Sequence, residues 1–559
     1  MNSFSIIDWS VVGLYFVGLI GIVYWSAQHQ KTTTDYFLAG RHAPWLVVGA
    51  SLFASNIGSE HIVGVAGTAA ISGMALAHNE LHAWVMIVLA WVFVPFYYKS
   101  GVFTMPEFLE RRFDARIRWM LSIFSLIAYV FTKVSVTVYA GALVFKTLLP
   151  DTFGSPDNAF WVGAFTTVIL TGIYTIFGGL RSVLYTEVAQ SIILLLGSFF
   201  ITVFALDRLG GWGELQALAS SNAKNFSLWR PMSDPQFPWL GIVISASVVG
   251  IWYWCTDQYI IQRTLAAKSL KDARRGALFG GLLKVWPVLI FLIPGMIGWA
   301  LHQKGLMYIP SQQNGTIDGN QVFAIMVTSL LPEGLRGLVV AGLLSALMSS
   351  LASLFNSCAT LFTVDIYEKI KPGMSEAHLV LVGRIATAVV VIAGLIWIPV
   401  MHNMAGGGLY LYLQNVQSYI APPITAVFIL GLFWRRCTAQ GAFWGLIIVF
   451  ALGMIKLGAE AYIQNSHLET GLLHSFSSFN YLYYSCLLLA ISVAVIVAIS
   501  YLTPATPKEQ IAGITFATLS AEDKAEIKDS WDKWDILLTI IVAGLVLVMY
   551  LYFSFWLES

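Results

Sequence analysis

The sequence predicts an all-α membrane protein that crosses the bilayer about fourteen times. Of its 559 residues, 57% are hydrophobic and only 11% are charged, whereas soluble proteins carry roughly 25% charged residues. Apolar stretches of about 20 residues, long enough to span a bilayer, recur along the whole chain. Lysine and arginine gather in alternate loops between these stretches, as the positive-inside rule requires.

The apolar stretches give the predicted spans in chain order. We expect them at roughly 7–26, 45–71, 80–100, 118–148, 158–178, 182–206, 238–262, 275–302, 336–366, 377–401, 409–433, 438–458, 479–503 and 534–557. The first segment lacks the basic flank of a cleavable signal peptide and is expected to be retained.

The loop charges set the expected orientation. Basic residues are frequent in the odd-numbered loops, whereas the even-numbered loops carry only Arg208, Lys224, Arg230, Lys304 and Arg336. The odd loops are therefore expected in the cytoplasm, with both termini outside. Two of these loops should be partly helical, at 105–113 and around 521–528 within a cytoplasmic linker at 504–533.

A polar island interrupts the second span at 54–61, where Asn56, Gly58, Glu60 and His61 stand between apolar runs. Lipid cannot satisfy the backbone groups of a broken helix, so a break at this depth persists only beside a cavity, an ion or a solute. The span at 238–262 is interrupted in the same way at 253–258. Paired interrupted spans, each opening a group of five, indicate two inverted repeats with a transport site at their interface.

Three further polar features lie within spans. Ser345, Ser349 and Ser353 recur every fourth residue on one helical face, either bonding backbone carbonyls or binding a cation such as Na⁺. Lys284 lies about ten residues inside its span, where it either snorkels or serves a solute or Glu80 as partner. Gln414 shares a face with two other polar residues beside aromatic rings, which suits either a structural role or a sugar.

Absent features exclude several classes of function. The chain has no phosphate-binding loop, no potassium-selectivity filter and no nucleophile elbow, so a P-loop pump, a potassium channel and an enzyme are not expected. The net charge of +1 suggests no nucleic-acid partner. Four single cysteines form no disulfide framework, and the histidines show no metal-ligand spacing.

Several contiguous motifs resemble a sodium/glucose cotransporter of the sodium:solute symporter family. They are DYFLAGR at 35–41, GASLFASNIGS at 49–59, WYWCTDQ at 252–258, SSL at 349–351 with FNS at 355–357, and GAFWG at 441–445. The resemblance implies a LeuT-like core of two inverted five-helix repeats with discontinuous first helices, at roughly 43–207 and 238–433, in a single transmembrane domain.

The resemblance also implies the residues of both binding sites. Sodium, the coupling ion, would be held by backbone carbonyls in the broken helix and by groups of the facing helix: Ala54, Ile57, Ala346, Ser349 and Ser350. The sugar would be held by Asn56, His61, Glu80, Tyr253, Trp254, Lys284 and Gln414, with Tyr253 as the inner gate. Glu60 receives no role.

The chain departs from the family pattern in four ways. Ala352 and Glu187 stand where some relatives hold a second sodium with Thr and Asp, so we expect one sodium per sugar. Asn79 replaces an aromatic outer-gate residue. Gln417 replaces a smaller hydroxyl residue near the sugar, which bears on hexose preference. The cysteine-bearing extracellular loops of eukaryotic members are missing, which suggests a bacterial inner-membrane protein.

The predicted function is sodium-coupled symport of a hexose, glucose or galactose, by alternating access. Two alternatives stay open: a sodium-coupled carrier of myo-inositol or another polyol, and a sugar-gated sensor or ion leak. The expected partners are the hexose, sodium and the lipid bilayer, and the sequence leaves the oligomeric state undetermined.

Overall fold

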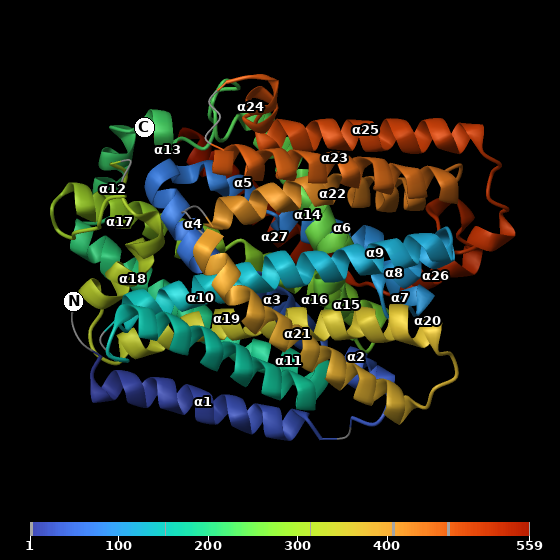
Figure 1. Cartoon of the computed structure of the whole chain (residues 1–559), viewed down its shortest axis with the longest axis horizontal. Coiled ribbons are helices and arrows are strands. Elements are labelled where there is room, and N and C mark those ends of the chain that lie inside the picture. Colours follow the sequence, from blue (N-terminus) through green and yellow to red (C-terminus); the bar gives the residue numbers. More distant parts are fainter. Residues whose placement is uncertain are drawn as a thin grey trace.

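The computed structural model is built from helices that run along its long axis (Figure 1). It describes residues 4–28, 30–150, 152–312, 315–404, 409–466 and 470–557. Within those ranges the only β contacts are two isolated bridges. The predicted all-α fold is confirmed.

The fourteen predicted spans correspond to helices of the structure. These are α1 (Ile6–Ser26), α3 with α4 (Trp45–Asn56, Ser59–Ser72), α5 to α7 (Ala77–Glu80, Ala83–Val88, Val94–Ser100), α9 with α10 (Ala115–Ala128, Ser135–Leu148), the two halves of α11 (Pro156–Leu209), α14 with α15 (Trp239–Ile251, Gln258–Leu265), α16 with α17 (Leu270–Lys284, Ile293–Gln303), α19 (Leu335–Thr360), α21 (Glu376–Met404), α22 (Leu409–Phe433), α23 (Ala439–Ser466), α25 (Tyr481–Leu502) and α27 (Lys533–Phe555).

Counted as continuous runs, the described helices that are long and apolar enough to span number 12, because two runs contain bends. Helix α11 has 54 residues, about 81 Å at 1.5 Å per residue, far more than the roughly 30 Å of a bilayer core. It turns at Gly179, whose φ is 52° and ψ −159°. The run 59–100 turns at Gly73 (φ 62°, ψ −135°). The part of this run before Gly73 is α4, which forms one span together with α3, and the part after Gly73 forms the next span.

Shorter helices lie between the spans. They are α2 (Thr33–Leu38), α8 (Met105–Arg112), α12 (Trp212–Ser220), α13 (Ala223–Phe226), α18 (Gly319–Leu330), α20 (Glu368–Ile370), α24 (Leu472–Ser477) and α26 (Ala521–Asp529). The two helices expected in odd loops are present as α8 and α26. Helix α8 begins after Thr104, whose side chain accepts the Glu107 N–H, with proline in its first turn.

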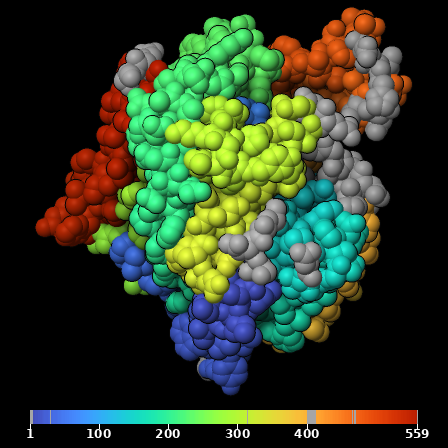
Figure 2. Space-filling view, turned by 90° about the vertical axis from the view of Figure 1, so that its left-hand side faces the viewer, coloured from blue at the N-terminus to red at the C-terminus, as the bar shows by residue number. Residues whose placement is uncertain are grey.

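The odd and even loops separate to opposite ends of the molecule. Helices α2, α8, α20 and α26 lie at the right-hand end of Figure 1, and α12 and α13 at the left-hand end with both chain ends. Seen from the left-hand end, the green and yellow-green segments around α12, α13 and the α17–α18 connection lie side by side over the surface (Figure 2). Alternate loops at opposite ends are expected of a chain that crosses the bilayer repeatedly, and two termini at the same end require an even number of crossings.

Both interrupted spans are broken at the predicted places. Between α3 and α4, Ile57 is extended (φ −92°, ψ 93°) and Gly58 caps the second helix. Helix α14 passes into a wide π-helical turn, η5 (Trp252–Thr256), and stops at Asp257 (φ −82°, ψ 126°) before α15 begins. The two breaks meet, because the Tyr259 hydroxyl of α15 donates to the Ser55 carbonyl of α3.

Burial divides the helices into a core and a periphery. Helix α19 is buried almost throughout, whereas α1, α25 and α27 bury only a small share of their surface. The peripheral helices expose large apolar side chains such as Leu14, Ile540 and Leu551. A surface of this kind suits lipid rather than water, so the chain is a multi-pass membrane protein built around α3, α4, α15 and α19.

Candidate functional site

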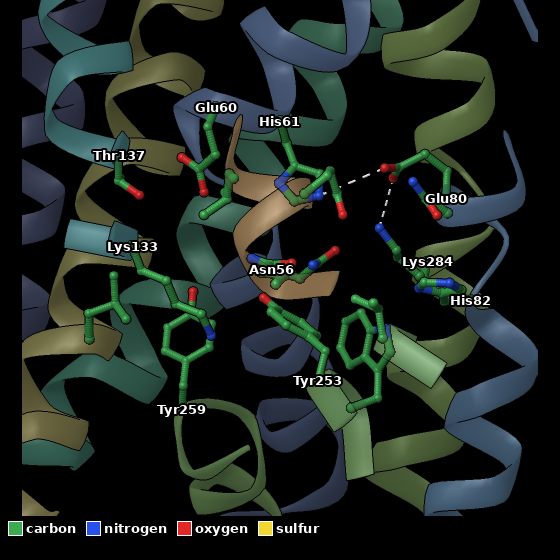
Figure 3. A pocket seen from close by; sticks show the side chains of 17 residues that line it. Asn56, Glu60, His61, Glu80, His82, Lys133, Thr137, Tyr253, Tyr259 and Lys284 are labelled. Atoms are coloured by element: carbon green, nitrogen blue, oxygen red, sulfur yellow. Dashed lines mark hydrogen bonds and ion pairs between the residues drawn. The ribbon is translucent and has the colours of Figure 1, made fainter. Parts of the chain in front are cut away.

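A cavity lies at the two helix breaks (Figure 3), where small-molecule sites of transporters with broken helices are expected. All seven residues predicted to bind sugar line it. The remaining lining residues are Glu60, Asn79, His82, Lys133, Thr137, Val249, Tyr259, Leu354, Leu413 and Gln417. The structure therefore gathers the predicted sugar residues, from five separate spans, around one space.

One wall of the cavity carries a buried ion pair. The Lys284 ammonium lies 2.8 Å from a Glu80 carboxylate oxygen. Lys284 is therefore paired with Glu80, one of the partners that the sequence suggested. The other Glu80 oxygen lies 3.8 Å from His61 Nε2, and the ammonium lies 6.0 Å from the Trp254 ring centroid. The pair presents a donor and an acceptor at the same place, as recognition of neighbouring hydroxyl groups requires.

The end of the cavity beside η5 is aromatic. Tyr253 and Trp254 follow each other in η5 with their rings edge to face at 5.1 Å. A π-helical turn is wider than an α-helical one and frequently marks a functional position. The Tyr253 ring lies against the cavity (Figure 3), as expected of a ring stacked under a sugar.

Lys133 lines the cavity next to this aromatic end and contacts its rings. It lies in a second π-helical stretch, η4 (Tyr129–Val134), and donates to the Asp257 carboxylate. Its ammonium lies 4.7–5.0 Å from the ring centroids of Tyr129, Trp252, Tyr253 and Tyr259, close enough for cation–π attraction. Lys133 thus connects the break at Asp257 to the ring expected to act as the gate.

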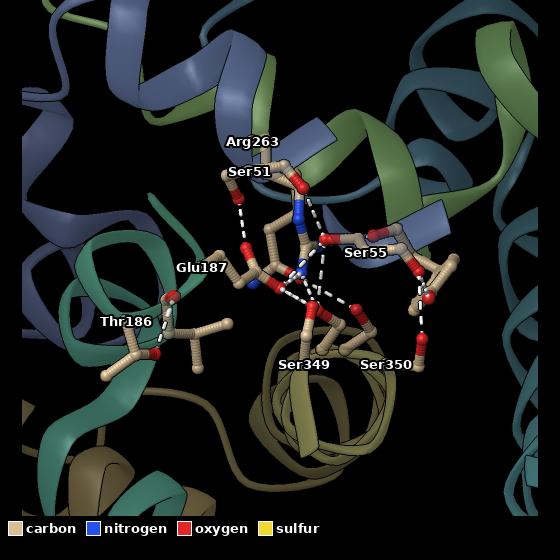
Figure 4. Close-up of polar contacts among 12 residues, drawn as sticks. Ser51, Ser55, Thr186, Glu187, Arg263, Ser349 and Ser350 are labelled. Atoms are coloured by element: carbon tan, nitrogen blue, oxygen red, sulfur yellow. Dashed lines mark hydrogen bonds and ion pairs between the residues drawn. The ribbon is translucent and has the colours of Figure 1, made fainter. Parts of the chain in front are cut away.

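A second polar centre lies beside the first break, around Glu187 of α11 (Figure 4). Its carboxylate accepts from the hydroxyls of Ser51, Ser55, Ser349 and Ser353. Arg263 Nη2 lies 3.4 Å from the same carboxylate, and neither charged side chain is exposed. A buried charge needs compensation of this kind.

The predicted sodium residues lie next to this centre. The backbone ladder of α3 ends with Ile57 N–H donating to Phe53 O, and that of α4 begins with His61 N–H donating to Gly58 O. Among the described residues, no backbone bond joins the two ladders, so the carbonyls at the end of α3 are left for other donors or for a cation. Ser350 donates to the Ser55 carbonyl at 3.2 Å, whereas the Ser349 hydroxyl points to Glu187. Ala54, Ile57 and Ala346 are buried.

The three serines predicted to share one face of α19 have different hydrogen-bond partners. Ser349 and Ser353 donate to the Glu187 carboxylate, whereas Ser345 donates to the carbonyl of Ala341, four residues back. The predicted span ends at 262 and leaves Arg263 in the following loop, but α15 continues to Leu265 and buries Arg263 completely. Thr137, Tyr259 and His82 of the cavity were also missed. Tyr259 could have been found from its position two residues beyond the break.

Comparison with known proteins points to one family. The sequence profile of the Sodium:solute symporter family matches residues 36–449. The chain is 39% identical over 557 residues to Sodium/glucose cotransporter 4 of Danio rerio, covering 94% of this chain and 83% of that protein. It is 37% identical to Sodium/myo-inositol cotransporter 2 of Homo sapiens, covering 91% and 79%.

The fold has a solved counterpart. The structure of a substrate-bound, outward-open Na⁺-coupled sialic acid symporter superposes with a TM-score of 0.75 at 22% identity, covering 90% of this chain and 99% of the other. At that identity the likeness concerns the fold alone.

Proposed function

The chain belongs to the sodium:solute symporter family, and on that premise we propose that it carries a hexose, glucose or galactose, together with sodium. One observation carries the proposal: Asn56, His61, Glu80, Tyr253, Trp254, Lys284 and Gln414 line one cavity at the meeting point of two broken helices. Amides and an ion pair suit the hydroxyl groups of a sugar. The aromatic rings suit its apolar C–H faces.

Sodium would bind at the opposite side of the same break. The carbonyls of Ala54, Ile57 and Ala346 and the hydroxyls of Ser349 and Ser350 form an all-oxygen set, and hard cations prefer oxygen ligands. Rotation of the Ser349 hydroxyl from Glu187 toward the ion would complete the set. The helix dipole favours a cation at the carbonyl end of α3.

A transport ratio of one sodium per sugar fits the centre around Glu187. Its carboxylate already has a guanidinium and four hydroxyls around it, so it needs no second cation. Ala352, at the position where some relatives carry Thr, has no hydroxyl to offer a second sodium.

Uptake into proteoliposomes tests the proposal. We expect accumulation of radiolabelled glucose or galactose that requires an inward sodium gradient, with one charge moved per sugar. Uptake that is the same in potassium or choline would refute sodium coupling. Because sodium/myo-inositol cotransporters are similar to this chain, myo-inositol belongs in the substrate panel, and preference for it would reassign the substrate to the polyols.

We place the odd loops in the cytoplasm of a bacterial cell and both termini outside. Lys224 of α13 and Lys524 of α26 are exposed, and these two helices lie at opposite ends of the molecule (Figure 1). Of the four native cysteines, three are buried and Cys486 is partly buried, so background labelling is low. A membrane-impermeant maleimide should label Lys224→Cys in intact spheroplasts and Lys524→Cys only after lysis; the reverse pattern would invert the topology.

A further inference from the structure

Glu60 is the charged residue of the cavity to which neither the motifs nor the comparisons give a role. It is the second residue of α4, and its side chain lines the cavity with only 8% of its surface exposed. The carboxylate lies over the helix break: a Cβ added to Gly58 would be 2.2 Å from Glu60 Oε2. A side chain at position 58 would therefore have to displace this carboxylate from its place beside the break.

Glu60 differs from the other charged groups of the cavity in its contacts. Glu80 has Lys284 at 2.8 Å, and Lys133 donates to Asp257. The Glu60 carboxylate has only weaker partners, the Thr137 side chain, its own backbone N–H and the more distant charge of Lys133, and its Oε2, like Asn56 Oδ1, is buried with no hydrogen-bond partner among the described residues. A buried carboxylate oxygen without a donor costs more than a neutral group in the same position.

The position of Glu60 shows which ligand group could supply the donor. In Figure 3 the Glu60 carboxylate points into the cavity from the side that carries Thr137 and Lys133, and Glu80 with Lys284 lies on the opposite side, with Asn56 between. A carboxylate accepts hydrogen bonds and cannot donate them. A ligand held by Glu80 and Lys284 at one end would need a hydroxyl donor in its middle for Asn56 and another at its far end for Glu60.

We propose that Glu60 is a further sugar-binding residue, whose carboxylate accepts a hydrogen bond from one hydroxyl of the hexose at the end remote from Lys284. The proposal rests on the hexose function proposed above and adds a determinant of specificity to it. A site that binds a hydroxyl through a buried polar group discriminates strongly against the analogue that lacks it, because the group is then left unpaired. The transporter should therefore discriminate strongly against the deoxy-hexose that lacks this hydroxyl, and only that penalty should depend on Glu60.

Glu60 also has a structural role to be separated from this one. A carboxylate in the first turn of α4 stabilises the helix through its unpaired N–H groups and its dipole. The contribution of this helix stabilisation to affinity is the same for every sugar, whereas a hydrogen bond to one hydroxyl affects only sugars that carry that hydroxyl. A double-mutant cycle, in which Glu60 is substituted and one hydroxyl is removed from the sugar, separately and together, therefore distinguishes the two roles.

The experiment measures the apparent affinity of sodium-driven uptake for glucose and for each monodeoxyglucose in proteoliposomes, at saturating sodium. In the wild-type protein we expect the deoxy sugar that lacks the hydroxyl bound by Glu60 to bind at least about tenfold more weakly than glucose, because a hydrogen bond to a charged group is lost. In Glu60→Leu the same deoxygenation should cost no more than about twofold, and in Glu60→Gln, whose amide oxygen still accepts a hydrogen bond but carries no charge, it should cost an intermediate amount. The penalties for the other deoxy sugars should stay unchanged. Two variants are used so that a folding failure of Glu60→Leu leaves Glu60→Gln, and Glu509→Gln, an exposed glutamate of the cytoplasmic linker, serves as control.

If the penalty for each deoxy sugar is the same in the two variants as in the wild type, the proposal is overturned and Glu60 is a helix cap only. A wild-type protein that shows no sodium-driven uptake of any hexose would refute the proposed function itself, and the role of Glu60 with it. The two failures are distinguished by the wild-type measurement with unmodified glucose.

Discussion

At the scale of single residues, Lys284 and Glu80 form the ion pair on which one wall of the cavity depends. Both side chains are buried, 2.8 Å apart. Removing one member of a buried pair leaves the other charge uncompensated, at a cost of about 3–5 kcal/mol. We expect Lys284→Met to lower the unfolding temperature of the purified protein, measured by a thiol-reactive dye assay, and to abolish sugar uptake.

The double variant Lys284→Met/Glu80→Gln is the control for that experiment. It removes both charges, so we expect most of the lost thermal stability to return. Uptake should stay absent, because the groups that would bind the sugar hydroxyls are still missing. Wild-type affinity in the double variant would show that the pair is structural and takes no part in sugar binding.

Ser350 and Ser353 lie one turn apart on α19 and have different partners. Ser350 donates to the carbonyl of Ser55 at the end of α3, and we propose it as a sodium ligand. Ser353 donates to Glu187. We expect Ser350→Ala to raise the sodium concentration that gives half-maximal uptake about tenfold, because the ion loses one ligand and a bond to a charged group is worth about this much. Sugar affinity at saturating sodium should change little.

Ser353→Ala is the matched control for Ser350→Ala. It removes a hydroxyl of the same kind from the same helix, but one that serves the Glu187–Arg263 pair. Its expected effect is on thermal stability, with sodium activation unchanged. Sodium activation curves shifted equally by both substitutions would contradict the assignment of Ser350.

At the scale of elements, the bend in α11 depends on a single glycine. Gly179 has φ 52° and ψ −159°, and a Cβ there would lie 2.6 Å from the Tyr36 carbonyl oxygen. A non-glycine residue in such a conformation costs about 1–3 kcal/mol before any clash is counted. We expect Gly179→Ala to reduce the yield of monodisperse protein in detergent severely, because the two halves of α11 could no longer pack as antiparallel spans.

Gly458 provides the comparison for that substitution. It lies inside α23, and nothing lies within 4 Å of an added Cβ. Alanine there should stabilise the helix by roughly 0.5–1 kcal/mol. Similar losses of monodisperse protein for Gly179→Ala and Gly458→Ala would show that the bend tolerates a side chain.

The elements also show where sequence reasoning succeeds. The polar island at 54–61 and the segment at 253–258 predicted both helix breaks, because polar groups at bilayer depth are rare and need a reason. The π-helical turns η4 and η5 were not predicted. An apolar span surrounded by lipid and protein has no clear 3.6-residue periodicity from which a one-residue insertion could be detected.

At the scale of the whole molecule, the sequence predicted which residues gather around the cavity better than it predicted how they pair. The family motifs identify seven cavity residues, and the charge pattern identifies two groups of loops. The pairing of Arg263 with Glu187 joins residues 76 positions apart, and nothing local to either residue indicates the other. Arg263 also follows an apolar run directly, so it reads as a loop residue even though α15 carries it inside.

The arrangement around α3 and α4 leads to a prediction about coupling. Asn56 and His61 of the break line the cavity, and Ser55 accepts from Ser350 and Tyr259 on its other side. An ion that fixes the end of α3 therefore also fixes Asn56, so sodium and sugar should stabilise the same conformation. We expect sodium to tighten sugar binding by a factor within the 5–150-fold range typical of coupled sites.

Reciprocity makes this prediction quantitative. Because coupling is a free energy shared by two sites, saturating sugar must tighten sodium binding by the same factor. Equilibrium titration of the detergent-solubilised protein measures both factors, with sugar titrated at zero and saturating sodium, and sodium at zero and saturating sugar. Gln414→Ala should weaken sugar binding at both sodium levels and leave the factor intact, because Gln414 belongs to α22 and lies outside the break. Sugar affinity that does not depend on sodium would mean that the break at Ile57 and Gly58 holds the two sites side by side without coupling them.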